Sequence, residues 1–265
     1  MHIVVCLKQV PDTANVRINP ETNTLMREGV ESITNPFDEY ALEQALRLKN
    51  SHGAKVTTLT MGPPQAEVVL REAIARGADQ GFLISDRAFA GADTWATSYV
   101  ISRAIKKLNP AVDMVFFGKQ AIDGETAQVG PGVSEFLNYK LVTYARSITV
   151  GADGRFTAET LMDEGMEVVE GPLPVVVTVL RDGPLPRYAT LAGWMRARHA
   201  KIPVWGVTGL GVVPELCGLK GSPTRVMKIF VPPGKTGGIR MDGREMPSLA
   251  VEAILKILRD KGVSK

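Results

Sequence analysis

The sequence contains few cysteines and no long hydrophobic run. Its 265 residues include only two cysteines, Cys6 and Cys217, which lie far apart. Such a pair provides neither a disulfide framework nor a metal-ligand spacing, and Cys6, inside an apolar run, is expected to be a buried thiol. No apolar run approaches the roughly 20 residues that span a bilayer. The first residues also lack the basic leader and cleavage site of a signal peptide. We therefore expect a cytoplasmic protein without a membrane span.

A large excess of charge of one sign is also missing. The 31 Lys and Arg residues and 28 Asp and Glu residues leave a net charge of +3. A dedicated nucleic-acid binder would concentrate basic residues on one face, so we expect no nucleic-acid partner. Neither the glycine-rich dinucleotide motif nor the Walker motif occurs, which leaves a standard Rossmann dehydrogenase or P-loop enzyme unsupported. No nucleophile–base pair is recognisable, and we assign no catalytic residue.

The first half of the chain alternates apolar strands with helices. A long polar connection over 11–34 follows the first strand, and connections of this length are usually functional or covered by a partner. Apolar runs predict the strands, and prolines, N-cap residues and glycines set the helix bounds. The expected strands are 2–10, 54–61, 81–85 and 113–118, and the expected helices are 36–52, 63–77, 93–108 and 126–137. This order predicts a doubly wound, mostly parallel α/β sheet of the Rossmann-like nucleotide-binding kind, with helices on both faces.

The pattern changes after Leu141. Turn signals at 152–154 and 163–165 separate strand-like runs, which predict antiparallel strands that extend the same sheet, and 172–180 is a last apolar strand. From Arg181 onward proline and glycine are frequent, a composition that is poor at building its own core. Near the end, 248–258 is an amphipathic helix. We therefore divide the chain into a nucleotide-binding domain, 1–183, and a C-terminal recognition loop, arm and helix, 184–265, that pack on another chain.

The loops after the third and fourth strands have the composition of phosphate-binding loops. Right-handed crossovers place the carboxyl ends of parallel strands at one sheet edge, where ligands bind. Loops 86–98 and 118–131 both run through glycine and small hydroxyl residues into a helix N-terminus, and helix N-termini hold phosphates. Thr94 and Thr97 lie about one turn apart, and Lys119 adds a mobile positive charge. These loops predict a nucleotide site.

Simpler interpretations exist for some of these residues. Asp93 and Thr126 are also good ordinary N-caps. Trp95 suits core packing as well as it suits covering a ligand, and His52 and His199 are expected to be solvated. Two candidate phosphate loops on adjacent strands of one sheet nevertheless favour the ligand site over two unrelated caps.

Four segments of the chain resemble the electron transfer flavoprotein β-subunit family. Together they are highly specific, and the resemblance extends over nearly the whole chain, including 163–168 and 174–178. Thr160 stands where the family pattern has Lys or Arg. The four segments are 5–12 (VCLKQVPD), 35–37 (NPF), 118–124 (GKQAIDG) and 186–191 (PRYATL).

The resemblance implies a heterodimer with an α subunit. In this family the C-terminal arm of the β subunit wraps the α subunit, whose C-terminal domain holds one FAD and swings between redox partners. Phe37 and the loop near Thr13 correspond to positions that approach the α-subunit flavin. Leu191, with Arg187 and Tyr188, corresponds to the loop that docks a dehydrogenase.

The family has two subclasses that differ in what the β subunit binds. Conventional members hold a structural AMP and pass electrons from dehydrogenases to a quinone oxidoreductase. Electron-bifurcating members hold a second FAD, oxidise NADH there, and send electrons to an acyl-CoA dehydrogenase-type partner and to ferredoxin or flavodoxin. Residues 86–98 and 218–224 resemble bifurcating members, whereas 188–191 resembles conventional ones. We expect the bifurcating form, because an FAD pyrophosphate needs more donors than one AMP phosphate and loop 86–98 supplies them.

The expected cofactor site therefore combines the ends of the first four strands with the start of the first helix, and it needs no metal. Two rival functions share part of this pattern. A non-redox adenine-nucleotide-binding module would have the same loops but would not need the arm after Arg181. A self-contained enzyme would need catalytic residues that are not recognisable. The expected cofactor-binding residues are Cys6, Leu7, Lys8, Asn35, Met61, Gly62, Asp86, Arg87, Gly91, Asp93, Thr94, Thr97, Lys119, Gln120, Asp123, Gly124, Thr126, Ala127, Gln128 and Val129.

Overall fold

The computed structural model describes residues 1–12, 17–18, 25–26, 32–227, 237 and 240–263. The chain forms two compact units, Met1–Ile229 and Phe230–Lys265. The loop near Thr13, expected to approach a partner's flavin, lies outside the described residues.

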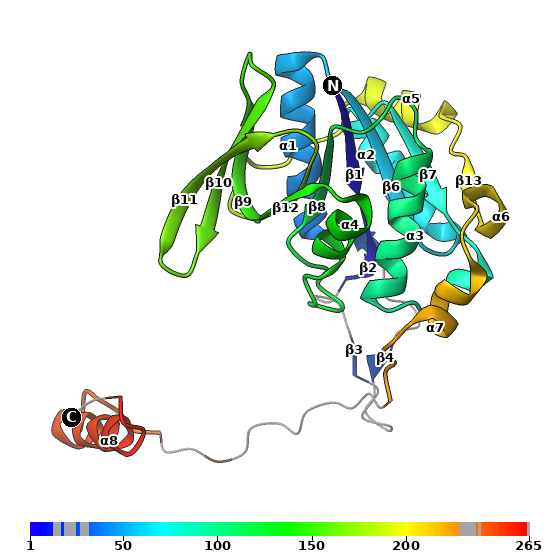
Figure 1. Ribbon diagram of the computed structural model, residues 1–265. Coiled ribbons are helices and arrows are strands. Elements are labelled where there is room, and N and C mark those ends of the chain that lie inside the picture. Colours follow the sequence, from blue (N-terminus) through cyan, green and yellow to red (C-terminus); the bar gives the residue numbers. More distant parts are fainter. Residues whose placement is uncertain (13–16, 19–24, 27–31, 228–236, 238–239, 264–265) are drawn as a thin grey trace. The chain divides into compact units, whose positions relative to one another are not determined.

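A nine-stranded sheet forms the centre of the first unit (Figure 1). The strand order is β11-β10-β9-β12-β8-β1-β6-β7-β13. In this order β10 runs antiparallel to both of its neighbours, and all neighbouring strands from β9 across the sheet to β13 are parallel to each other. This confirms the mostly parallel α/β sheet with an antiparallel extension. The strands are β1 (His2–Cys6), β6 (Lys55–Met61), β7 (Gln80–Ile84), β8 (Met114–Gly118), β9 (Lys140–Val150), β10 (Arg155–Met162), β11 (Gly165–Pro172), β12 (Val175–Val179) and β13 (Val204–Trp205).

Helices cover both faces of the parallel part of the sheet. Side chains alternate between the two faces along a strand. In β1, Ile3 and Val5 therefore pack in one buried cluster with Leu42, whereas Val4 packs in the other with Val100. One face carries α1 (Pro36–His52) and α2 (Glu67–Arg76), and the other carries α3 (Thr94–Lys107) and α4 (Val129–Leu137).

Local sequence signals explain where two of these helices begin and end. Pro36 occupies the first turn of α1, and Gly53 ends the helix with φ at 62°, a left-handed conformation that favours glycine. The carboxylate of Asp93 accepts the backbone N–H of Ala96 and caps α3. The N-cap expected at Asp93 is therefore confirmed.

Two expected boundaries were wrong. The first strand of the sheet ends at Cys6 and does not continue to Val10. The chain bends there, so that β2 (Gln9–Pro11) pairs with β5 (Ser32–Thr34) in a separate ladder. Within the polar connection, β3 (Arg17–Ile18) pairs with β4 (Leu25–Met26).

The second wrong boundary is the start of the fourth helix. It begins at Val129, not at Thr126, and Gln128 occupies the N-cap position. Ala127, the residue before Gln128, has φ at 55°, and Glu125 has φ at 53°. A right-handed helix cannot pass through residues with such positive φ values. Thr126 consequently belongs to the loop and not to the helix start.

The segment after β12 still belongs to the first unit. Its β13 pairs in parallel with β7, so 172–180 does not contain the last strand of the sheet, and α5 (Leu191–His199) packs against α2. The division expected at 183/184 falls inside this compact unit, which extends to Ile229. Its remaining elements are α5 (Leu191–His199), α6 (Val207–Leu210), α7 (Gly218–Gly221) and the short 3₁₀ turns η2 (Pro64–Ala66), η3 (Arg87–Phe89) and η4 (Pro214–Leu216).

The second unit contains the amphipathic helix that the sequence predicted near the C-terminus. It is α8 (Pro247–Asp260), in which Leu249, Ile254 and Ile257 are each more than half exposed. Among the described residues, no helix is long and apolar enough to cross a membrane. The same residues contain no cluster of His, Cys, Asp and Glu that could hold a metal ion.

Candidate functional site

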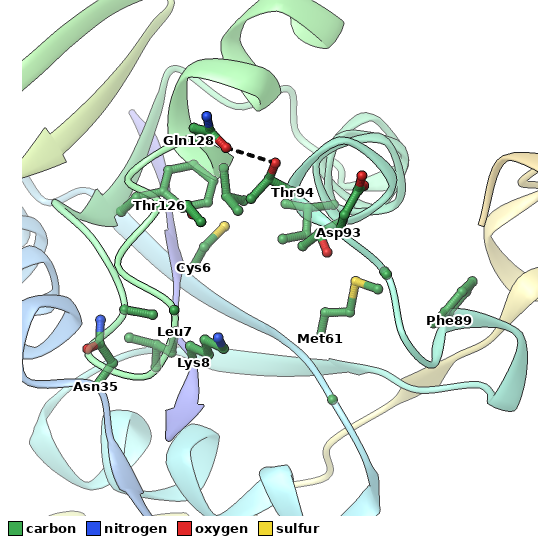
Figure 2. Close-up of a pocket in the computed structure, with 18 of the residues that line it drawn as sticks. Cys6, Leu7, Lys8, Asn35, Met61, Phe89, Asp93, Thr94, Thr126 and Gln128 are labelled. Atoms are coloured by element: carbon green, nitrogen blue, oxygen red, sulfur yellow. Dashed lines mark hydrogen bonds between the residues drawn. The ribbon is translucent and has the colours of Figure 1, made fainter. Parts of the chain in front are cut away.

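The carboxyl ends of β1, β6, β7 and β8 open onto one pocket of about 1070 Å³. The chain builds the sheet outward from β1 on one side and then crosses to β8 on the other, so this edge is the topological switch point of the fold. Ligands of doubly wound sheets bind at that point. All of the residues expected to bind a cofactor line this pocket except Asp123. Figure 2 labels several of them, among them Cys6, Thr94 and Gln128.

Asp123 does not line the pocket but pairs with a residue that does. Its carboxylate pairs with the Nζ of Lys8 at 2.7 Å, which joins the loop after β1 to the loop after β8. Both side chains are well exposed to solvent. The pair therefore links two walls of the site more than it stabilises the fold.

The N-termini of α3 and α4 meet at one end of the pocket. The Oγ1 of Thr94 donates to the Oε1 of Gln128 at 3.1 Å, as Figure 2 shows. Ser98 donates to the carbonyl of Val129, and a Cβ on Gly132 would lie 2.5 Å from the Ser98 hydroxyl, so only glycine allows this close approach. Two positive helix ends, together with the hydroxyls of Thr94 and Thr97 in the pocket lining, suit an anionic phosphate group.

The loop between β8 and α4 holds its backbone in an uncommon conformation at the pocket wall. Glu125 and Ala127 both adopt left-handed φ values, which cost non-glycine residues free energy and cluster at ligand sites. Gly124, which precedes Glu125, and Thr126, which lies between Glu125 and Ala127, also line the pocket. The ammonium group of Lys119 lies 5.3 Å from the ring centre of Tyr144, so this charge is held by an aromatic face and is less mobile than expected.

The N-terminus of α1 forms the floor of the site through side chains that reach two strand ends. Asn35 donates to the carbonyl of Gln120 at 2.9 Å. The carboxylate of Asp38 accepts the backbone N–H of Lys8 at 2.7 Å and that of Gly118 at 3.0 Å. Burial raises the pKa of Asp38 to about 7, although these hydrogen bonds and the charge of Lys8 oppose the rise.

Asp38 lines the pocket and was missed in the sequence analysis. Its position in the first turn of a helix is ordinary for an acidic residue, because a carboxylate there interacts favourably with the helix dipole. Only its spatial contact with β1 and β8 distinguishes it. A Cβ on Gly118 would lie 2.5 Å from the Asp38 Oδ1, so the glycine is required by this contact.

A second wall comes from two residues of the segment 217–226, none of whose members was among the expected binding residues. The Oδ2 of Asp93 accepts both the backbone N–H and the hydroxyl of Thr224, at 3.0 and 2.8 Å. The backbone N–H of Asp93 donates to the hydroxyl of Ser222. Thr224 and Val226 line the pocket. Asp93 thus caps α3 with one oxygen and holds this C-terminal segment with the other.

The lining of the pocket also includes apolar side chains at the strand ends, among them Cys6 and Met61. Burial, followed by the charge of Asp38, raises the pKa of Cys6 well above its usual range, so its thiol stays protonated and is no nucleophile. Asp86 accepts backbone N–H groups from Ala88 and Val207, which lower its pKa. Trp95 does not line the pocket and instead contacts other aromatic rings at the surface.

An apolar surface lies away from the pocket, on the segment that leads into α5. Tyr188 and Leu191 are 95% and 80% exposed, and Leu185, Trp194 and Met195 are exposed beside them in the sequence. Leu191 is therefore not packed under its own helix. Arg187 was expected to contact a partner, but its guanidinium is directed inward to Glu43.

Comparisons with known proteins agree with the resemblance of the motifs. Residues 22–210 match the family model described as the electron transfer flavoprotein domain. A caffeyl-CoA reductase-Etf complex subunit, CarD, of Acetobacterium woodii is 46% identical over 258 residues, which cover 97% of this chain and 98% of the relative.

Two other relatives are similar over most of their length. Protein FixA of Azotobacter vinelandii is 48% identical, with 88% of this chain and 84% of the relative covered. The electron transfer flavoprotein subunit beta of Clostridium acetobutylicum is 50% identical, with 86% and 87% covered.

Proposed function

This chain belongs to the electron transfer flavoprotein family as a β subunit, and from that premise we propose that it binds its own FAD in the pocket at the switch point. Bound there, FAD would supply the capacity to accept two electrons as a hydride from NADH, which becomes NAD⁺. One of these electrons would be destined for an acyl-CoA dehydrogenase-type flavoenzyme and the other for ferredoxin or flavodoxin. A partner α subunit holds a second FAD.

The observation that carries the proposal is the extent of the pocket. Its volume of about 1070 Å³ lies at the upper end of the roughly 300–1,000 Å³ typical of sites for drug-sized ligands. A mononucleotide would occupy only part of this volume. The lining includes the N-termini of α3 and α4 as well as the ends of β1, β6, β7 and β8, an extent that favours a dinucleotide.

The polar groups of the site fit the parts of such a ligand. Thr94, Thr97 and the backbone at the start of α4 would hold the pyrophosphate, because these residues line the pocket with hydroxyl and N–H groups that can donate to an anion; the Thr94 hydroxyl would turn from Gln128 to do so. Arg87 would lie at the redox end, with Met61 and the buried Cys6 supplying apolar contacts. When bound, FAD supplies the electron-transfer chemistry, and this chain orients it and limits the access of water.

Partner binding is proposed for two separate surfaces. The apolar face of α8 would bind the α subunit, because an exposed apolar face of this kind is unfavourable in water. The surface with Tyr188 and Leu191 would dock an acyl-CoA dehydrogenase-type flavoenzyme. A relative named as a subunit of a caffeyl-CoA reductase complex supports a partner that acts on CoA esters.

A conventional β subunit with AMP in the same pocket is the second candidate. The motif 188–191, which resembles conventional members, favours it. In that case the adenylate would occupy the end near α3 and α4, and electrons from dehydrogenases would pass to a quinone oxidoreductase through the FAD of the α subunit alone.

Denaturing the purified αβ complex and identifying the released nucleotides separates the two candidates. Two FAD per heterodimer, together with NADH-dependent bleaching of the flavin absorbance, supports the proposal. One FAD and one AMP, with no response to NADH, refutes it in favour of the conventional form. A Thr94→Val/Thr97→Val double variant is expected to lose about half of the flavin, and full retention would move the second FAD to another site.

A further inference from the structure

In the exposed apolar segment at 185–191, residues 185–190 have no helix or strand of their own to hold their shape, and Leu191 begins α5. Such a segment would normally adopt many conformations, and ordering it on binding would weaken association. The segment instead lies across α1, where a buried carboxylate receives it. That carboxylate belongs to Glu43, whose side chain is only 5% exposed.

Glu43 binds one residue of the segment through both side chain and backbone. Arg187 donates to the Glu43 carboxylate from its Nε at 2.8 Å, from its Nη2 at 3.0 Å and from its backbone N–H at 3.1 Å. Burial favours the neutral acid, but the bonds from Arg187 and Arg47 outweigh it and lower the pKa of Glu43. The carboxylate is therefore charged at neutral pH and its fork with Arg187 is retained.

The far end of the segment is fixed on α2. The hydroxyl of Thr190 accepts the backbone N–H of Gly193 and caps α5. A Cβ on Gly193 would overlap the carbonyl oxygen of Ala75, so α5 presses directly on α2 at this point. Arg71 of α2 in turn donates to the carbonyl of Ala197 at 2.6 Å. Tyr188 and Leu191 are thus presented between two anchored points.

We propose that Glu43 is a positioning residue for partner docking, which through Arg187 holds 185–191 in the conformation that receives the flavoenzyme. This inference rests on the proposed function of the 185–195 surface. The ion pair is a weak source of net stability, because desolvation of the buried Glu43 offsets much of the attraction. Its three hydrogen bonds nevertheless hold Arg187 in one geometry. Arg187 therefore acts from beneath the docking surface and not as a contact of the partner.

The test uses the αβ complex with a purified acyl-CoA dehydrogenase and its acyl-CoA substrate. Glu43→Gln keeps the shape of the side chain and removes its charge. We expect the KM for the complex to rise about tenfold, which corresponds to about 1.4 kcal/mol. The kcat should change less than about twofold, because docking and not electron transfer is perturbed. In the αβ complex without the dehydrogenase, amide hydrogen exchange at 185–191 should be faster in Glu43→Gln than in wild type.

The matched control is Arg47→Gln, which removes the other cation beside Glu43 from the exposed side of α1. It should leave both KM and the exchange of 185–191 unchanged. Arg187→Lys keeps a positive charge but loses the forked pair, and its KM should lie between wild type and Glu43→Gln. This variant also serves if Glu43→Gln does not fold.

Leu191→Ala distinguishes failure of this inference from failure of the docking proposal. If Leu191→Ala raises KM while Glu43→Gln and Arg187→Lys leave KM and exchange at the wild-type values, Glu43 has no positioning role. If Leu191→Ala leaves KM unchanged, the surface does not dock the flavoenzyme, and both the docking proposal and the inference are overturned.

Discussion

The carboxylate of Asp38 makes the stability of this protein depend on pH in an unusual direction. Burial raises its pKa to about 7, whereas an Asp in an unfolded chain has a pKa of about 3.9. Between these values the folded chain binds the proton more tightly than the unfolded chain does. The contribution of Asp38 to the free energy of unfolding is therefore fully present below about pH 4 and is lost as the pH rises through about 7. Because the pKa is about 7 in the folded chain and about 3.9 in the unfolded chain, the stability lost above about pH 7 is about 4 kcal/mol.

Replacing Asp38 with Asn tests this reasoning with little change of shape. Asn has one acceptor oxygen, so either Lys8 or Gly118 loses the partner of its backbone N–H. A buried donor without a partner costs about 1–3 kcal/mol, and this cost does not depend on pH. The variant also carries no charge to bury at high pH. It should be less stable than wild type near pH 4.5 and more stable near about pH 8, with the two curves crossing between.

The measurement is urea unfolding, followed by circular dichroism at pH steps from about 4.5 to about 8. The informative quantity is the difference between variant and wild type at each pH, because other titrating groups cancel in it. Glu39→Gln is the matched control, since Glu39 follows Asp38 on the same helix and pairs with Arg76 away from the pocket. A Asp38→Asn difference that stays constant across the pH range would refute the buried, titrating carboxylate.

Three further predictions concern other contacts. Gly118→Ala places a Cβ 2.5 Å from the Asp38 carboxylate and should destabilise the fold by about 1–3 kcal/mol, seen as a lower melting temperature; an unchanged value would contradict the close packing. Thr224→Val removes the hydroxyl that binds Asp93 and should speed amide exchange at 217–226 with bound nucleotide reduced; unaltered exchange would argue against this contact. Burial lowers the pKa of His2, so as the pH falls the unfolded chain takes up the His2 proton before the folded chain does. Wild type should therefore lose stability below about pH 6.5, and His2→Gln should lessen this loss. An identical loss of stability in acid for both proteins would contradict the role of His2.

Particular elements show how far the sequence predicted the fold. The apolar runs of the parallel strands and the capping residues of α1 and α3 are local signals, and their elements formed close to where expected. The start of α4 was misplaced because Thr126 has the chemistry of an N-cap, while the left-handed φ of Ala127 depends on how the loop closes the pocket. Likewise, the proline-rich composition after Arg181 predicted an arm but not the pairing of β13 with β7.

The candidate site divides in the same way. Composition and order along the chain determined the strand-end loops, because a parallel sheet brings its carboxyl ends to one edge whatever the details of packing. Tertiary structure alone decided that Asp38 joins two strand ends, that Thr224 meets Asp93, and that Arg187 turns inward to Glu43. These contacts join residues far apart in the chain through single side chains. No local periodicity or capping rule records them, and only the packing of the elements brings their atoms within hydrogen-bond distance.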